Sequence, residues 1–249
     1  MKQTINKERY KKQLLVPEFS EKKQQKIQQS TIVIIGGGGL GSNSANLLAR
    51  TGVGTIKIID DDLVELSNIH RTSLFSEDDI GKNKSRILEE KLSMINSEIT
   101  IKGINTKADK NNIEELVHNT DIILDGTDNI KTRLLINDIS VKNNIPWVYG
   151  GVAGTTGMAM GIIPGKTPCI RCISQNISSS TTSEQGTFSI LPGIVASIQC
   201  MEAIKILLGE KPSGLIIYDI WKQCFEQMNI QRNPACFCCG KHSFEFLEE

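Results

Sequence analysis

The sequence predicts an α/β fold, namely a doubly wound, mostly parallel (Rossmann-like) sheet with a C-terminal antiparallel extension. Two observations support this fold class. Short β-branched runs alternate with helical patterns over residues 31–150, and a glycine-rich turn follows the first run. Strands that alternate with helices pair in parallel through right-handed crossovers. Past Gly150, glycines and β-formers instead predict antiparallel strands.

The elements are expected in a regular order. Residues 1–30, rich in Lys, Gln and Glu, are interpreted as helices and a loop packed onto the body, and the Ser/Thr-rich stretch 178–183 as a mobile loop. A helix at 191–209, with Pro192 in its first turn and Gly209 at its end, precedes a β-hairpin formed by 214–220 and 223–230. Parallel strands are expected at 31–35, 55–59, 98–104, 121–129 and 146–150, with helices at 43–50, 83–96, 112–119 and 130–143.

The composition excludes several classes of protein. The chain has 249 residues with 28 basic and 28 acidic side chains, so no net field indicates nucleic acid or an anionic membrane as a partner. The N-terminus is polar, without a signal peptide's apolar core, and no run approaches the roughly 20 apolar residues of a membrane span. A cytoplasmic protein is expected.

The glycine turn predicts a nucleotide site. Gly36, Gly38 and Gly41 form a G-x-G-x-x-G pattern between a strand and a helix, where backbone N–H groups can approach phosphate. Asp60 ends the next strand, where a carboxylate can accept hydrogen bonds from ribose hydroxyls. This pattern does not distinguish NAD from ATP, because both contain an adenosine ribose.

The residues that follow favour phosphoryl chemistry. Arg71 and Lys84 supply cations suited to a triphosphate, and Asp128, just past the strand that begins at 121, suits the hard cation Mg²⁺. Each could be an ordinary solvated charge when considered alone. Gathered at one edge of the sheet, they indicate phosphoryl transfer, since hydride transfer requires none of them.

Four of the seven cysteines form two C-x-x-C pairs, Cys169/Cys172 and Cys236/Cys239, with the spacing of a structural Zn²⁺ site. A redox C-x-x-C is the competing interpretation, and Cys238 could replace a neighbour as ligand. The two remaining cysteines, Cys200 and Cys224, are expected to be core residues. An odd number of cysteines and the absence of an export signal argue against a disulfide framework.

Eight motifs resemble, in order, those of the ThiF/MoeB/HesA adenylyltransferases, bacterial relatives of ubiquitin-activating enzymes: ERYKKQLLVPEF, GGGGLGS, TGVGTIKIIDDDLVELSNIHR, DIGKNKS, LDGTDN, PCIRC, LPGIVASIQCMEAIK and NPACFCCG. The resemblance runs from about Glu8 to Gly240. It implies a homodimer that uses Mg²⁺ and ATP to adenylate the C-terminal Gly-Gly carboxylate of a small ubiquitin-like sulfur carrier (ThiS/MoaD-like).

The resemblance also implies roles for individual residues. Gly39 and its neighbouring glycines would lie under the nucleotide, and Asp60 would hold the ribose. Asn68, Arg71 and Lys84 would bind the phosphates. Asp128 would assist Mg²⁺, and the paired cysteines would bind Zn²⁺. The chain 1–249 then divides into an N-terminal helical arm (1–30), a nucleotide-binding half (31–150) and a zinc-stapled, carrier-binding half (151–249).

Two positions depart from the family pattern. Lys12 stands where the family usually has an arginine that reaches the partner subunit's ATP, and lysine lacks the bidentate fork; Arg9 is an alternative donor. Thr182 aligns with a cysteine that many members carry in a crossover loop, and a threonine hydroxyl is a poor nucleophile without an activating base. We therefore expect the enzyme to stop at the acyl-adenylate, with a separate sulfur donor.

Three alternatives remain open at this point. The first is a related adenylating enzyme that acts on another carboxylate, in a peptide natural product or tRNA modification pathway. The second is an NAD-dependent oxidoreductase, which would leave the phosphate cations and cysteine pairs without a role. The third is a scaffold that binds a carrier protein without ATP turnover.

Overall fold

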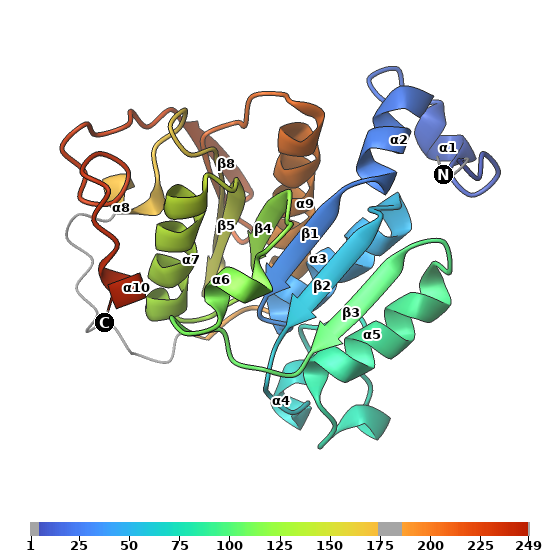
Figure 1. Ribbon diagram of the computed structural model, residues 1–249. Coiled ribbons are helices and arrows are strands. Elements are labelled where there is room, and N and C mark those ends of the chain that lie inside the picture. Colours follow the sequence, from blue (N-terminus) through green and yellow to red (C-terminus); the bar gives the residue numbers. More distant parts are fainter. Residues whose placement is uncertain (1–4, 174–185, 249) are drawn as a thin grey trace.

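Eight strands form one mixed sheet in the computed structural model, which describes residues 5–173 and 186–248 (Figure 1). The strand order is β3-β2-β1-β4-β5-β6-β7-β8; the first five strands are parallel and the last three pair in antiparallel fashion. This arrangement confirms the predicted parallel sheet with an antiparallel extension. The strands are β1 Thr31–Ile35, β2 Thr55–Ile59, β3 Thr100–Ile104, β4 Ile122–Asp125, β5 Trp147–Ala153, β6 Thr156–Ile162, β7 Leu215–Asp219 and β8 Cys224–Met228.

Helices cover both faces of the sheet, and the side chains on both faces of β1 are accordingly buried. Ile32 and Ile34 pack into a core with apolar residues of α3, α5 and α9, whereas Val33 and Ile35 pack into a second core with residues of α7. The helices are α1 Lys11–Leu14, α2 Glu21–Gln28, α3 Gly39–Thr51, α4 Leu66–Ile69, α5 Lys84–Ile95, α6 Ile113–Leu116, α7 Ile130–Asn143, α8 Ile170–Ile173, α9 Leu191–Leu208 and α10 Glu245–Glu248, with a 3₁₀ turn at Glu77–Asp79.

Two predicted elements are only about half as long in the structure as the sequence predicts. The strand expected over 121–129 ends at Asp125, because Asn129 caps α7 by accepting a hydrogen bond from the Thr132 N–H at 2.8 Å. The helix expected over 112–119 covers only Ile113–Leu116, and Asn119 beyond it has a φ of 54°. The side-chain cap and the left-handed residue therefore set these boundaries.

The strand order reverses between β1 and β4, which are neighbours although two strands separate them in sequence. In open α/β sheets, ligands bind outside the carboxyl ends of the strands at such a switch point. The predicted glycine turn follows β1 and the predicted Asp128 follows β4. The topology thus brings these two segments to the same edge of the sheet.

Helix α9 has the length and apolar composition of a membrane span, with a mean hydropathy of 1.5, and is the one such helix within residues 5–173 and 186–248. It packs against β5 and β6 of the sheet and against α3, and Val195, Ala196 and Ala203 are fully buried. These contacts make α9 a core helix of the fold.

Candidate nucleotide site and cysteine cluster

The glycine turn between β1 and α3 holds two strand ends together. Gly36 has a φ of 92°, and a Cβ on it would lie 2.5 Å from the carbonyl oxygen of Gly126. A Cβ on Gly41 would overlap the carbonyl oxygen of Gly36. Gly38, in contrast, faces open space, and no side chain caps the following helix α3. The first N–H groups of this 13-residue helix are therefore available to an anion.

Asp60 lies directly after β2 and fixes the glycine turn. Its carboxylate, 8% exposed, accepts hydrogen bonds from the N–H of Gly37 at 2.6 Å and of Asp62 at 2.8 Å. Burial raises the pKa of Asp60, and the Gly37 hydrogen bond and the charge of Lys84 only partly oppose this effect. The structure therefore places the predicted ribose-binding carboxylate beside the glycine turn.

Lys84 begins α5, and its side chain is only 10% exposed. Its Nζ lies 2.8 Å from Oδ2 of Asp62, a residue that the sequence analysis did not single out. The run of three aspartates, residues 60–62, could have indicated a partner for Lys84. The sequence alone does not show which of the three carboxylates faces the lysine. In this structure Lys84 is thus paired with a carboxylate that is itself 67% exposed.

Asn68 and Arg71 lie on and just after α4. Asn68 is buried, and its Oδ1 accepts a hydrogen bond from the Glu65 N–H at 3.1 Å, so the amide caps its own helix. The Arg71 guanidinium donates to the carbonyl of Ser67, and its Cδ lies within 3.5 Å of where a Cβ on Gly39 would be. Arg71 is therefore beside the glycine turn, and the Asn68 side chain caps α4.

Asp128 is exposed, two residues before α7, and follows a segment whose Thr127 N–H lies close to Gly36. Burial lowers the pKa of Arg133, but the charges of Asp125, Tyr149 and Asp128, together with the hydrogen bond to Asp125, outweigh burial, so that the pKa of Arg133 is raised. Arg133 was missed by the sequence analysis because nothing in its local pattern distinguishes it from a helix surface residue.

Lys12 does not lie near the glycine turn of its own chain. It is an exposed residue of α1, and its neighbour Gln13 donates to the carbonyl of Thr51 at the far end of α3. Figure 1 shows α1 beyond the amino-terminal end of β1. A contact between Lys12 and the site would therefore have to come from a second copy of the chain. Thr182 and the stretch 178–183 lie outside the described residues.

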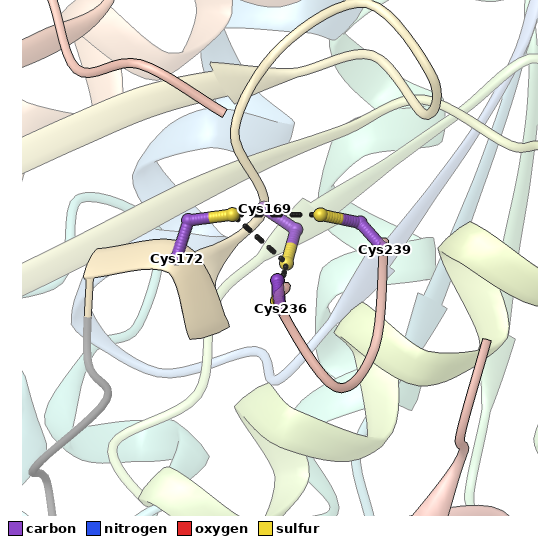
Figure 2. Close-up of side chains that lie close together, drawn as sticks. All are labelled: Cys169, Cys172, Cys236 and Cys239. Carbon is purple, nitrogen blue, oxygen red and sulfur yellow. Dashed lines mark hydrogen bonds between the residues drawn. The ribbon is translucent and has the colours of Figure 1, made fainter. Parts of the chain in front are cut away.

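The predicted cysteine pairs come together in three dimensions. The sulfur atoms of Cys169, Cys172, Cys236 and Cys239 all lie within 4.8 Å of one another (Figure 2). Three of the separations are 4.0 Å (169–172), 3.6 Å (169–236) and 3.4 Å (172–239). Zn–S bonds of about 2.3 Å in a tetrahedron imply S···S separations of about 3.8 Å. The donor set therefore fits Zn²⁺, with all four positions filled by protein sulfur.

The remaining cysteines differ in their surroundings. Cys238 is fully buried and accepts a hydrogen bond from the Asn137 side chain at 3.1 Å, and it is outside the four-sulfur group. Cys200 is in the core as expected, and burial raises its pKa to about 12. The expectation for Cys224 is wrong: it is exposed on β8, whose side chains are all exposed because β8 is the edge strand and none of residues 5–173 and 186–248 forms a layer over it.

The chain thus has a doubly wound sheet with a glycine turn, a carboxylate and two cations at its switch point. These features are typical of α/β proteins that bind nucleotides at the carboxyl ends of their strands. Residues 10–238 match the model of the ThiF family. The chain therefore belongs to the ThiF family.

Several curated relatives are adenylyltransferases. The chain is 37% identical over 215 residues to the sulfur carrier protein ThiS adenylyltransferase of Bacillus subtilis, an alignment that covers 84% of this chain and 64% of that protein. It is 33% identical to the molybdopterin-synthase adenylyltransferase of Escherichia coli, over 94% of this chain and 96% of that protein. These relatives identify the chain as an enzyme of the adenylyltransferase class.

The fold is also shared with solved structures. The crystal structure of E. coli MccB with AMPCPP and MccA has a TM-score of 0.85 and 27% identity, and the match covers 94% of this chain and 75% of that chain. The structure of MccB with ATP matches with a TM-score of 0.77 and 28% identity, over 88% of this chain and 69% of that chain.

Proposed function

We propose that this protein adenylates the C-terminal Gly-Gly carboxylate of a small ubiquitin-like sulfur-carrier protein, releasing pyrophosphate from ATP. The observation that carries the proposal is the gathering of Arg71, Lys84 and Asp60 around an uncapped helix N-terminus at the switch point. The names of the relatives support a carrier protein as the acceptor, because three of them, from B. subtilis, Thermus thermophilus and E. coli, are adenylyltransferases of sulfur-carrier or molybdopterin-synthase proteins.

In the proposed reaction, a carboxylate oxygen of the carrier attacks the α-phosphorus of ATP and the bond to the β,γ-pyrophosphate breaks. No general base is needed, since a C-terminal carboxylate is already ionised at neutral pH. The glycine turn and the α3 N-terminus hold the phosphates, and Asp60 holds the ribose. Arg71 and Lys84 stabilise the negative charge that develops on the phosphate oxygens.

Asp128 would hold Mg²⁺, which neutralises phosphate charge and favours oxygen ligands. Its exposure at the end of the β4 segment and its negative charge fit this role. The cysteine cluster would hold Zn²⁺ as a closed structural site. A homodimer in the cytoplasm would bring Lys12 of a second copy to the phosphates, and a separate donor would supply the sulfur.

Exchange of labelled pyrophosphate into ATP tests the proposal. The purified enzyme is assayed with ThiS-like and MoaD-like carriers, each with its Gly-Gly end and, as the matched control, with the last glycine deleted. We expect exchange that depends on Mg²⁺ and on the intact carrier end. Equal exchange with the truncated carriers would show that the Gly-Gly carboxylate is not the acceptor.

A second candidate is adenylation of a peptide rather than a folded carrier. The similarity to MccB, solved with MccA, favours this candidate. The same exchange assay with a short synthetic peptide, free or amidated at its C-terminus, distinguishes the two. Exchange with the free peptide and with none of the carriers would support the peptide substrate. A small open reading frame ending in Gly-Gly beside the gene would support the carrier.

A further inference from the structure

Asp125 and Arg133 form a buried ion pair beneath the candidate site. Asp125 is the last residue of β4, and its side chain is fully buried. The Nε of Arg133, on the second turn of α7, lies 2.9 Å from Oδ2 of Asp125, and the arginine side chain is 16% exposed. Buried ion pairs contribute little net stability compared with apolar pairs of the same volume. Stability alone therefore does not explain this pair.

The remaining hydrogen bonds of the pair hold the segment that leads to Asp128. The Nη2 of Arg133 donates to the carbonyl oxygens of Thr127 at 2.7 Å and Gly150 at 3.1 Å. Oδ1 of Asp125 accepts from both the N–H and the hydroxyl of Thr127, at 2.9 and 2.8 Å. One guanidinium thus joins the end of β4, the Thr127 segment and the middle of β5.

Other side chains fix the arginine and β4 in place. The Arg133 guanidinium lies over the ring of Tyr149, 5.4 Å from its centroid. From the opposite core, the fully buried Gln199 of α9 donates to the carbonyl oxygen of Asp125 at 2.9 Å. A planar guanidinium can satisfy several acceptors in one fixed geometry, which a lysine ammonium on a flexible stem does less well.

We propose that Arg133 is a positioning residue for the adenylation reaction: it makes no contact with ATP but holds residues 126–129, and through them the Asp128 carboxylate, at the rim that faces Gly36. This inference rests on the proposed function. Gly126 lies against Gly36 of the glycine turn. A shift of residues 126–129 would therefore change the position of Asp128 relative to that turn.

The expected effect of a change at Arg133 depends on which part of the site it contacts: the glycine turn with Asp60, or the segment that carries Asp128. Gly37 of the glycine turn donates a hydrogen bond to Asp60, and Arg133 instead bonds Asp125, Thr127 and Gly150. ATP binding without Mg²⁺ should therefore survive a change at Arg133, while turnover falls. A displacement of about 1 Å at a reacting centre costs about 100-fold in rate.

The main test variant is Arg133→Lys, which keeps the buried positive charge beside Asp125 but cannot bond the same set of acceptors. Lys131→Met, an exposed change on the same helix, is the matched control. We expect kcat for pyrophosphate exchange to fall about 10- to 100-fold in R133K, with the affinity for ATP in the absence of Mg²⁺ and the thermal midpoint close to wild type. The control should keep the wild-type kcat.

A double variant tests whether Arg133 acts through Asp128. If it does, R133K combined with Asp128→Asn loses no more activity than Asp128→Asn alone, since the second change removes the group that the first displaces. Losses that multiply would overturn the proposal, as would a folded R133K with wild-type kcat. An R133K protein that is unfolded would assign Arg133 a purely structural role, which also overturns it.

A binding measurement separates this inference from the proposed function. Calorimetry measures the ATP affinity with and without Mg²⁺, and it requires no carrier and no turnover. We expect Mg²⁺ to strengthen ATP binding in the wild type and to do so less in both R133K and D128N. Failure of every acceptor in the exchange assay would refute the proposed function. An unchanged Mg²⁺ effect in R133K would refute the role of Arg133.

Discussion

The Asp60 carboxylate has a role in the fold and, in the proposed function, a second role in holding the ribose. It anchors the glycine turn through Gly37, yet its burial disfavours the charge that a ribose hydroxyl would bind. We predict that Asp60→Asn weakens ATP binding about tenfold, the effect of losing one hydrogen bond to a charged group. Because an amide has one acceptor oxygen, the variant also leaves the N–H of Gly37 or Asp62 without its partner, which should lower the free energy of unfolding by about 1–3 kcal/mol. Isothermal calorimetry and urea unfolding measure the two effects.

The pH dependence of this variant has a definite sign. Because the pKa of Asp60 is higher in the folded than in the unfolded chain, the native state binds more proton between the two values. Wild-type stability therefore decreases as pH rises through this window, and D60N lacks that decrease. A wild-type stability advantage over D60N that grows with pH would contradict this account.

Arg71 and Asp128 are the side chains on which the phosphoryl-transfer proposal depends most. Replacing either by alanine should raise the barrier to adenylation by about 3–4 kcal/mol, the loss seen when one preorganised electrostatic group is removed. Pyrophosphate exchange measures the change. The exposed Arg86 on α5, changed to alanine, is the control and should show no loss. Normal exchange in R71A or D128A would show that the reacting centre lies elsewhere.

At the scale of the element, different glycines of the turn are expected to matter for stability and for ATP binding. Gly36→Ala places a Cβ 2.5 Å from a backbone oxygen at a φ of 92°, and we expect it to cost about 1–3 kcal/mol of stability. Gly38→Ala meets no atom within 4 Å, so stability should change by less than about 0.5 kcal/mol, although the methyl group obstructs phosphate. Thermal unfolding and ATP titration distinguish the two. Equal destabilisation would refute this division.

The sequence predicted the order and type of the main elements because their signals are local. The apolar runs at 31–35 and 55–59 coincide with β1 and β2, and Gly209 ends α9 in the left-handed conformation. Boundaries that depend on one side-chain cap, as at Asn129, were placed less well. The exposure of Cys224 was missed because period and composition do not show which strand lies at a sheet edge without a covering layer.

At the scale of the whole molecule, local motifs were sufficient to predict the site residues, but only the folded structure shows which of them contact one another. The sequence indicated Asp60, Arg71 and Lys84 as a group. It could not show that Asp62 pairs with Lys84, or that Arg133 lies under the Thr127 segment, because these contacts join elements that are distant in the chain.

The cysteine cluster links the middle of the chain to its C-terminal segment, so the Zn²⁺ that we propose there should hold that segment, and its removal should loosen it. Chelation, or Cys236→Ser, should lower the melting temperature by about 2–4 °C for each kcal/mol lost and expose residues 229–248 to protease. The exposed Cys224→Ser is the control and should leave both unchanged. Metal analysis together with limited proteolysis makes the measurement. Full protease resistance of the metal-free protein would show that the metal is not needed to hold the C-terminal segment in place.

The distance along the chain between the two cysteine pairs has a consequence for synthesis. Cys236 is made 64 residues after Cys172 (236 − 172). At the usual rate of about 5–20 residues per second, the first pair waits roughly 3–13 s for its partners. A nascent chain therefore carries one cysteine pair without the other for several seconds, and the four-sulfur group can form only after the second pair has been made.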